Sequence, residues 1–440
     1  MRALAFALVA SIAASAHAQP AGPDAGAAAG ARTVASPEQD APAPREGEPT
    51  GNGAAAAPEP AENETVVVSG RPLSRDRTQD ATEVTGAKLR DSPRATTFEA
   101  LSQESAGVYV PAHGAMHGIG NGATGGIHLR GLGGSPNSQV LVVEDGVPDY
   151  QGIFGHPIPD AYAPFLIDDA LVIKGGDSVL FGTNAMGGVV AIRNRWRDHE
   201  GSEVSSDSAY GSYTTLRESA SLLARLGSWD LATGVESMST AGHRMGAGGD
   251  DLVASAAARY RFDGDLKLTV REKVVHLEGS DPGPDTHPYV DHTFEAWRDG
   301  ASAQLAWSRD GLRLSVTPYL NVGVHRLYDG FHSVDYVGGA IAEVETRLHP
   351  TTELLVGVAA EKVGGEVDNR ITGDPTPVKG LADGALYEQL TFRPFDQLSF
   401  VAGGRELYSS RYGFVPLYKA GARLGLGEGF YVHTRLTRNF

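Results

Sequence analysis

From about residue 203 onward, the sequence is a succession of segments in which apolar and polar residues alternate. Examples are Arg313–Leu320, Glu353–Ala360 and Leu398–Gly403. Alternation with a period of two places successive side chains on opposite faces of a sheet. Segments of about ten residues with weak alternation, separated by turns, are typical of a transmembrane β-barrel, although a soluble β-sandwich gives a similar pattern. The barrel is predicted to span residues 198–440.

Aromatic residues support a membrane setting for this region. Tyrosine and tryptophan recur near the ends of the segments, where the interfacial belts of a barrel hold such residues. The residues concerned are Tyr210, Tyr213, Trp229, Trp297, Trp307 and Tyr319. Lipid is therefore predicted to contact the outer face of the sheet.

The N-terminal residues 1–18 have the features of an export signal. Arg2 supplies a positive start, Ala3–Ala13 is an apolar run, and Ala16-His17-Ala18 is a cleavage site before Gln19. An apolar helix of a cytoplasmic protein is the alternative. No later stretch reaches the roughly 20 apolar residues that a membrane helix requires. The chain is therefore predicted to be exported and to be periplasmic, secreted or inserted as a barrel.

Composition excludes several classes of function. The chain has no cysteine, which excludes a disulfide scaffold, a thiolate metal site and a cysteine nucleophile. The formal charge of −17 argues against nucleic acid as a partner. No carboxylate pair or Ser/His/Asp trio has a spacing that suggests catalysis, and the glycine-rich residues 118–126 lack the lysine-serine ending of a phosphate loop. We predict neither an enzyme nor a bound cofactor.

The region before the barrel divides into three parts. Residues 19–62 are rich in Ala, Pro and Gly and are predicted to be a disordered linker. Residues 63–79 contain a short strand-like run, Glu64-Thr65-Val66-Val67-Val68, whose free edges could add to the sheet of a partner. The alternative is that this run is the first strand of the next domain. Residues 80–197 are a compact, glycine-punctuated α+β region.

Local signals within this α+β region predict its elements. Gln139–Val143 and Ala170–Ile173 are short apolar strands, and Asp145-Gly146 is a tight-turn signal. Thr97–Ser102 suits a short helix capped by Thr96 or Thr97.

Three motifs in this region carry a specific resemblance. Ile127–Gly133 holds an arginine-glycine step, Leu141–Pro148 holds an acidic "DGVP" step, and Leu171–Ile192 combines a strand, a glycine turn, an aromatic-glycine step and a final "GGV" strand. In this order and spacing, they resemble the plug domain of TonB-dependent outer-membrane receptors. Two departures are Asp177, where the family usually has proline, and Phe181, where it usually has tyrosine. Asp177 can still form a turn through its side chain.

The resemblance implies a fold, a location and a partner. The expected fold is an antiparallel transmembrane β-barrel with an N-terminal α+β plug inside the lumen, located in the outer membrane. Residues 64–68 stand where the family carries its TonB box, which implies coupling to the TonB complex of the inner membrane. A barrel of about 22 strands has a lumen wide enough to leak and must be plugged.

A plug inside a polar lumen needs charges that pair with the barrel wall. The candidates are Arg130, Glu144, Asp145 and Lys174. The alternative is that each is a solvated loop residue.

The length does not accommodate a full family barrel. About 22 strands of ten residues with turns need well over 400 residues, and only residues 198–440 remain, with ten to twelve plausible strands. Phe440 resembles the terminal aromatic residue of outer-membrane proteins, but Arg438 stands where a lipid-facing apolar residue is expected. We expect a C-terminally truncated sequence, with a closed half-size barrel as the alternative.

Histidines suggest the cargo. Imidazole and thioether groups suit Cu, Zn, Ni or Fe, and the plug region carries a set of them. The candidate metal ligands are His113, Met116, His117, His128 and His156. A second polar cluster, a candidate ligand loop, comprises His325, Asp329, His332 and Asp335. Histidines scattered by chance on polar loops are the alternative for the metal ligands, and a tight periplasmic turn is the alternative for the ligand loop.

The function predicted from the sequence is energy-coupled import of a scarce solute, a metal ion or a metal chelate. Alternatives are a passive or adhesive barrel and an importer of a vitamin or an oligosaccharide. A passive pore needs neither a plug nor the residues 64–68. A receptor that also signals is disfavoured by the low-complexity linker, and a secreted enzyme is a distant alternative.

Overall fold

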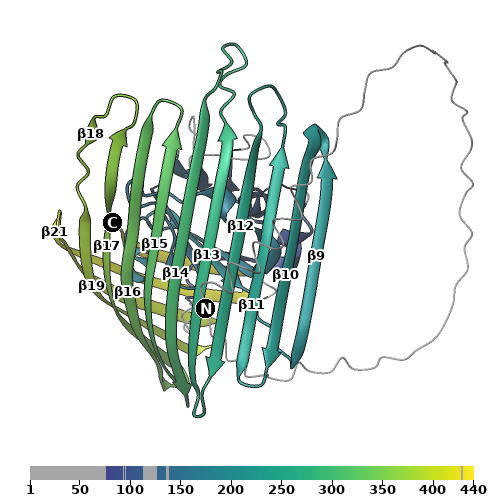
Figure 1. Cartoon of the computed structure of the whole chain (residues 1–440). Coiled ribbons are helices and arrows are strands. Elements are labelled where there is room, and N and C mark those ends of the chain that lie inside the picture. Colours follow the sequence, from purple (N-terminus) through teal and green to yellow (C-terminus); the bar gives the residue numbers. More distant parts are fainter. Residues whose placement is uncertain (1–75, 93, 95, 112–125, 135–137, 428–429) are drawn as a thin grey trace, which may run out of the picture. The chain divides into compact units, whose positions relative to one another are not determined.

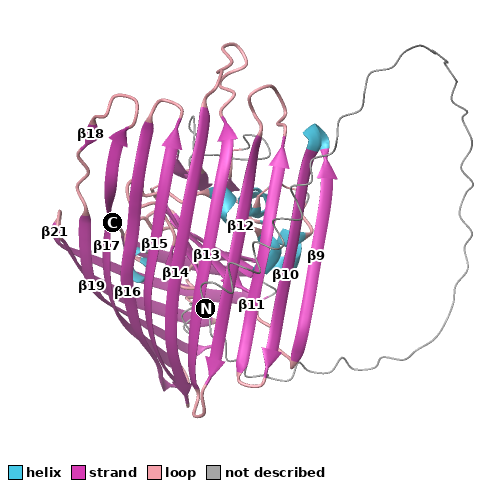
Figure 2. Cartoon of the chain, viewed as in Figure 1, coloured by secondary structure: helices cyan, strands magenta, loops and turns pink. Residues whose placement is uncertain are grey.

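The structure, a computed structural model, describes residues 76–440 apart from 93, 95, 112–125, 135–137 and 428–429. The predicted signal peptide, the linker, residues 64–68 and the histidines at 113 and 117 lie outside these residues. The described chain falls into two parts, a plug and a long antiparallel wall (Figures 1 and 2). In the described part of the chain, no helix has the length and apolar character needed to cross a membrane.

The plug combines a mixed five-stranded sheet with short helices and a small three-stranded sheet. The larger sheet has the order β1-β7-β8-β5-β6, in which only β5 and β8 run parallel. The elements are β1 (Asp80–Thr85), α2 (Gly86–Arg90), α3 (Thr97–Glu104), β2 (Val108–Tyr109), β3 (Ile127–Leu129), β4 (Leu132–Gly134), β5 (Val140–Glu144), β6 (Val147–Pro148), η1 (Pro159–Ala161), η2 (Pro164–Leu166), β7 (Ile167–Lys174), α4 (Ser178–Phe181) and β8 (Gly188–Asn194).

Local sequence signals explain several of these elements. The predicted helix is α3, and its N-cap is Thr96, whose hydroxyl accepts a hydrogen bond from the Glu99 amide at 3.2 Å. The strands predicted at 139–143 and 170–173 are β5 and part of β7. Asp145 and Gly146 both have positive φ, as the two central residues of a tight hairpin turn require.

The wall is a 14-stranded antiparallel sheet in which neighbours along the chain pair with one another. Its elements are β9 (Gly201–Gly211), η3 (Ser212–Thr214), β10 (Thr215–Leu226), β11 (Trp229–Thr240), β12 (Gly249–Arg261), β13 (Leu266–Ser280), β14 (Thr293–Arg309), β15 (Leu312–Leu327), β16 (Phe331–His349), β17 (Thr352–Asn369), β18 (Pro375–Thr376), β19 (Leu381–Phe395), β20 (Leu398–Ser409), β21 (Gly413–Gly427) and β22 (Phe430–Arg438).

The wall differs from the sequence expectation in strand length and in closure. Strands β13 to β17 have 15 to 19 residues each, so the expected length of about ten residues was wrong for them. Among the described residues, the strand order begins at β9 and ends at β22 without pairing these two strands, so the sheet is not a closed half-size barrel.

The two ends of the wall are unlike. At one end the connections are short, such as residues 227–228, 310–311 and 396–397. At the other end they include the longer residues 241–248, 281–292 and 370–380. Outer-membrane barrels have short periplasmic turns and longer extracellular loops, so the expected barrel would have its short-turn end in the periplasm.

The outer face carries aromatic side chains near the short turns. Trp229 packs edge-on against Tyr260, with ring centroids 4.8 Å apart, and Tyr260 against Phe262 at 4.7 Å. Tyr319, one of the predicted belt residues, instead has a buried side chain whose hydroxyl donates to Glu361 at 2.6 Å. The belt prediction was therefore wrong for Tyr319, since alternation alone does not say which face is inward.

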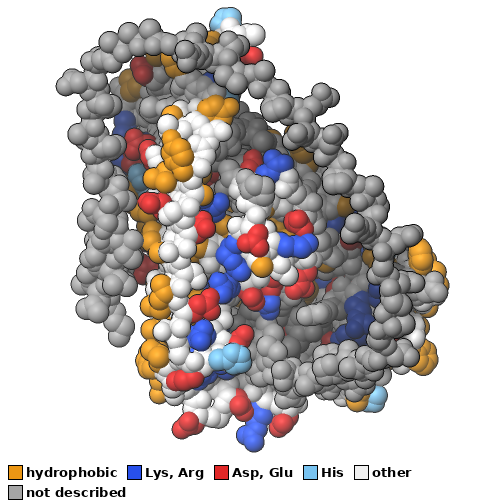
Figure 3. Space-filling model, turned by 90° about the vertical axis from the view of Figure 1, so that its right-hand side faces the viewer, with side chains coloured by type: hydrophobic (Ala, Val, Ile, Leu, Met, Phe, Trp, Pro, Cys, Tyr) orange, Lys and Arg blue, Asp and Glu red, His pale blue; other side chains and the backbone are white. Residues whose placement is uncertain are grey.

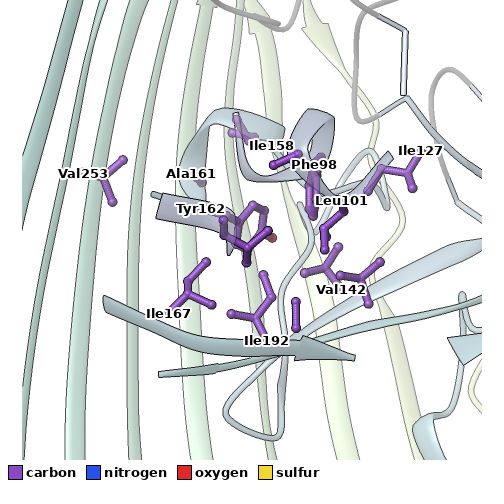
Figure 4. Packing of buried hydrophobic residues seen from close by; sticks show 14 of the residues in the cluster. Phe98, Leu101, Ile127, Val142, Ile158, Ala161, Tyr162, Ile167, Ile192 and Val253 are labelled. Carbon is purple, nitrogen blue, oxygen red and sulfur yellow. The ribbon is translucent and has the colours of Figure 1, made fainter. Parts of the chain in front are cut away.

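The main hydrophobic core joins the plug to the inner face of the wall. Phe98 and Tyr162 lie at its centre, with ring centroids 5.0 Å apart (Figure 4). Val253 of β12, which is only 3% exposed, belongs to the same cluster, as do Leu223 and Val275. Burying apolar side chains of both parts in one cluster holds the plug against the wall.

Candidate functional site

The hairpin formed by β5 and β6 makes a densely charged contact between plug and wall. Its Glu144 lies 2.5 Å from the ammonium group of Lys273 on β13, and Asp149 lies 2.9 Å from the same group. The three side chains are 13–20% exposed. A lysine shared by two carboxylates in a mostly dehydrated setting is a strong ionic contact, provided that no partner is removed.

Asp145 extends the same contact. Its carboxylate lies 3.0 Å from Arg271, two residues before Lys273 and on the same face of β13. It also accepts hydrogen bonds from the backbone amide and the side-chain amide of Asn194, at 3.1 and 2.8 Å. The tip of the hairpin is thereby fixed both to the wall and to the end of β8.

Arg298 of β14 holds the plug loop that follows the hairpin. It donates to the backbone oxygen of Tyr150 at 2.9 Å and lies 3.6 Å from Asp149 and 3.4 Å from Asp335 of β16. Asp335 in turn accepts a hydrogen bond from the Gly152 amide at 2.6 Å. A Cβ on Gly152 would lie 2.2 Å from the Tyr336 backbone oxygen, so only glycine permits this approach.

The cations determine the ionisation of Asp149. Burial alone would raise the pKa of this carboxyl, but Lys273 and Arg298 outweigh burial and hold the pKa below its usual value. The carboxylate is therefore charged at neutral pH, as the contact requires.

A second charged contact joins the closing turn of the plug to β21 and β22. Asp177 lies 2.9 Å from Lys419 and 3.1 Å from Arg435, and Gln79 donates to it at 2.5 Å. The same two cations lie 3.9 and 3.7 Å from Asp76. The side chains of Asp177 and Lys419 are both 0% exposed. Asp177, predicted from the sequence to form a turn through its side chain, makes no such capping hydrogen bond and uses its carboxylate as an ionic anchor.

We predict that acid weakens this anchor. Burial would raise the pKa of Asp177, but Lys419 and Arg435 outweigh burial, so the pKa of this carboxyl in the folded protein lies below its usual value. A depressed carboxyl pKa contributes stability that is complete above the unfolded pKa and is lost as pH falls through the folded pKa. In thermal unfolding from pH 7 to pH 2, the wild type should lose stability below about pH 4. Asp177→Asn should be less stable at pH 7 and should show a smaller loss on acidification. Parallel pH profiles for the two proteins would contradict the assignment.

The four plug charges predicted from the sequence have different environments. Glu144 and Asp145 contact the wall as described above. Arg130 instead pairs with Asp80 of the plug and has a side chain that is 52% exposed. Lys174 is 7% exposed and donates to the Thr82 hydroxyl, also within the plug, at 2.8 Å. The structure therefore does not place Arg130 or Lys174 on wall partners.

The predicted metal ligands are not brought together among the described residues. His128 is in β3 beside Tyr109, whereas His156 is 3% exposed and contacts Gln151 at 3.2 Å. Burial lowers the pKa of His156, which therefore stays neutral at physiological pH. Within the described ranges, no group of three or more His, Asp or Glu side chains could hold a metal ion.

The predicted ligand loop is divided between two environments. His325 and Asp335 are 1% and 0% exposed on the inner face, with Nδ1 of His325 lying 3.8 Å from Asp335. His332 pairs with Asp368 at 2.5 Å, and Asp329 accepts a hydrogen bond from the Phe331 amide in the turn. His325 and Asp335 therefore support the plug and do not form an extracellular loop.

Sequence reasoning missed the wall side of both contacts. The missed wall residues are Arg271, Lys273, Arg298, Lys419 and Arg435, and the plug carboxylate Asp149 was missed as well. One signal was present, since Arg271 and Lys273 stand two residues apart in a strand and must share a face. Basic residues repeated on one face of a barrel strand would have indicated a polar lumen.

This arrangement, a small α+β domain fixed by ion pairs to the inner face of an antiparallel wall, is that of a plug beside the strands of a β-barrel. Residues 74–189 match the family model of the TonB-dependent Receptor Plug Domain. No curated protein matches the sequence.

Solved structures support the fold of the whole described chain. The siderophore receptor PirA from Pseudomonas aeruginosa aligns with a TM-score of 0.65 at 17% identity, covering 82% of this chain and 62% of PirA. The FrpB iron transporter from Neisseria meningitidis gives 0.67 at 14% identity, with 82% and 64% covered. The copper transporter OprC gives 0.65 at 14% identity, with 81% and 62% covered. The chain thus spans about three fifths of the length of these proteins.

Residues 74–189 are therefore a TonB-dependent receptor plug domain, and the fold of the chain is that of the siderophore receptor and the iron transporter compared above. The plug domain is a module of transport receptors rather than of enzymes. The expected fold class and location are confirmed.

Proposed function

We propose that the protein imports a scarce solute across the outer membrane with energy from the TonB complex. The observation that carries this proposal is the ionic attachment of the plug to the wall, through Lys273, Arg298 and Lys419. A passive pore gains nothing from a plug held by buried ion pairs. Displacing such a plug separates buried charges, which costs several kcal/mol, so passage requires an energy source.

We propose a metal chelate, a siderophore-like complex, as the cargo. The similar solved structures include siderophore receptors, an iron transporter and a copper transporter. The described residues contain no cluster that could hold a bare ion, which favours a chelate that supplies its own ligands. A role for His113, Met116 and His117 as metal ligands stays a prediction, since these residues lie outside the described ranges.

Energy coupling is tested by separating binding from uptake. Cells that express the protein should accumulate a labelled ferric chelate, and a protonophore should stop accumulation while surface binding persists. The physical reason is that binding at the outer face needs no plug displacement, whereas passage does. Accumulation that continues at the same rate after collapse of the proton gradient would favour a passive barrel. Cells that lack the protein provide the baseline.

A further inference from the structure

A cluster of basic side chains lies on the inner face of the wall at its periplasmic end. Arg225 of β10, Arg259 and Arg261 of β12 and Lys267 of β13 all stand within a few residues of the short turns at 227–228 and 262–265. The cluster belongs to neither of the plug contacts described above. We name these four residues the mouth cluster.

One buried carboxylate serves three of these cations. Asp230 of β11 is 0% exposed and lies 2.9 Å from Arg225, 2.8 Å from Arg261 and 3.7 Å from Arg259. Arg225 and Arg261 also donate to the backbone oxygens of Asp198 and Gly227, which holds their guanidinium groups in place. Three of the four positive groups thus share this carboxylate, and Lys267 stands beside them in the sheet, so the four residues and Asp230 together carry an excess of positive charge.

Lys267 adds electrostatic repulsion to this excess of positive charge. It stands directly opposite Arg261 in the β12–β13 register, so the two like charges share one face. Like charges directly opposite one another destabilise a sheet. Within the described part of the chain, no carboxylate lies within ion-pair distance of Lys267. The neighbouring Glu200 accepts a hydrogen bond from the Gly227 amide at 2.7 Å, and Asp263 and Asp265 in the turn form no ion pair with the cluster.

The plug borders the cluster on one side. The indole ring of Trp196 lies 3.9 Å from the guanidinium carbon of Arg259. Trp196 directly follows Arg195, which pairs with Glu203 at 2.8 Å. Side chains of both signs gather in the middle of the face drawn in Figure 3. Arg225 and Arg261 stay 25–26% exposed, so a ligand can reach their remaining N–H groups.

We propose that the mouth cluster is an anion subsite, which takes a phosphate or carboxylate group at the periplasmic end of the lumen. Guanidinium groups bind planar and tetrahedral oxyanions through paired N–H donors, and lysine adds a point charge. Given the import function proposed above, such a site receives the anionic group of a cargo that leaves the lumen. The same chemistry would also retain free periplasmic phosphate.

The test is a calorimetric titration of the purified full-length chain with inorganic phosphate, against sodium chloride at equal ionic strength. The wild type should bind phosphate, and phosphate should raise its unfolding midpoint, because a ligand that binds only the native state stabilises it. The double variant Arg261→Gln, Lys267→Gln should bind at least tenfold more weakly. Without phosphate at low salt, Lys267→Gln should unfold no earlier than the wild type, since a repulsion is removed.

A matched control is Lys362→Gln, an exposed lysine of β17, which should leave phosphate affinity unchanged. Equal phosphate affinity in the wild type and the double variant, or no binding by the wild type at millimolar phosphate, would overturn the proposal. Competition by iron(III) citrate would assign the site to carboxylate-bearing cargo, whereas phosphate binding without competition would assign it to free phosphate. These measurements need no energy source, so they succeed or fail independently of the import function.

Discussion

Replacing Lys273 with methionine is expected to destabilise the plug–wall assembly by roughly 3–5 kcal/mol, the usual cost of removing one partner of a buried ion pair. The substitution keeps the apolar stem but leaves Glu144 and Asp149 without the ammonium group that lies 2.5 and 2.9 Å away. Asp149 keeps Arg298 at 3.6 Å, whereas no other cation is within ion-pair distance of Glu144 among the described residues. An uncompensated carboxylate there should draw water between the plug and the wall.

Two measurements check this result. Thermal unfolding in detergent should show a lower midpoint, and cells that express the variant should become more sensitive to bulky antibiotics. The matched control is Lys362→Met, which removes an exposed lysine that lies 5.9 Å from the Tyr336 ring and should cost less than about 1 kcal/mol. Equal stability and permeability of the two variants would show that the ion pairs of Lys273 do not stabilise the plug–wall assembly.

The sequence predicted those features that depend on local pattern. Period-two alternation located β15, β17 and β20, and the Asp145-Gly146 turn is where the hairpin reverses. The length of strands β13 to β17 was underestimated because each strand extends beyond its apolar segment. The polar residues at the strand ends resemble turn residues in the sequence. Whether the sheet closes into a barrel depends on which edge strands pair with each other. The alternation of apolar and polar residues gives no information about that pairing.

At the candidate site, the sequence did not predict contacts between residues that are far apart in the chain. Asp177 was expected to form a turn through its side chain, but that carboxylate makes no capping hydrogen bond and pairs instead with Lys419, 242 residues away. Arg130 and Lys174 have the same chemistry as the wall-binding charges but point to partners inside the plug. The residue types therefore predicted that the plug charges would be paired. Only the fold shows which partner each charge has.

Replacing Val67 with proline is expected to abolish uptake while leaving ligand binding at the cell surface intact. Val67 stands in the middle of Glu64–Val68, the run that resembles a TonB box and lies outside the described residues. Added strands bind through main-chain hydrogen bonds, and proline removes the amide donor and fixes φ near −65°. Because the substitution is nine residues before Asp76, where the described chain begins, the plug–wall contacts should persist.

The control for this prediction is Val67→Ile, which keeps the amide and the β-branched side chain and should support normal uptake. Labelled chelate accumulation and surface binding, measured on the same cells, separate the two effects. Loss of both activities in Val67→Pro would indicate misfolding or failed export instead of lost coupling, and the amount of protein in the outer membrane would reveal it. Normal accumulation by Val67→Pro would mean that energy reaches the plug by another route. In that case, the ionic contacts of Asp76 and Asp177 with Lys419 and Arg435 would anchor the plug without taking part in coupling.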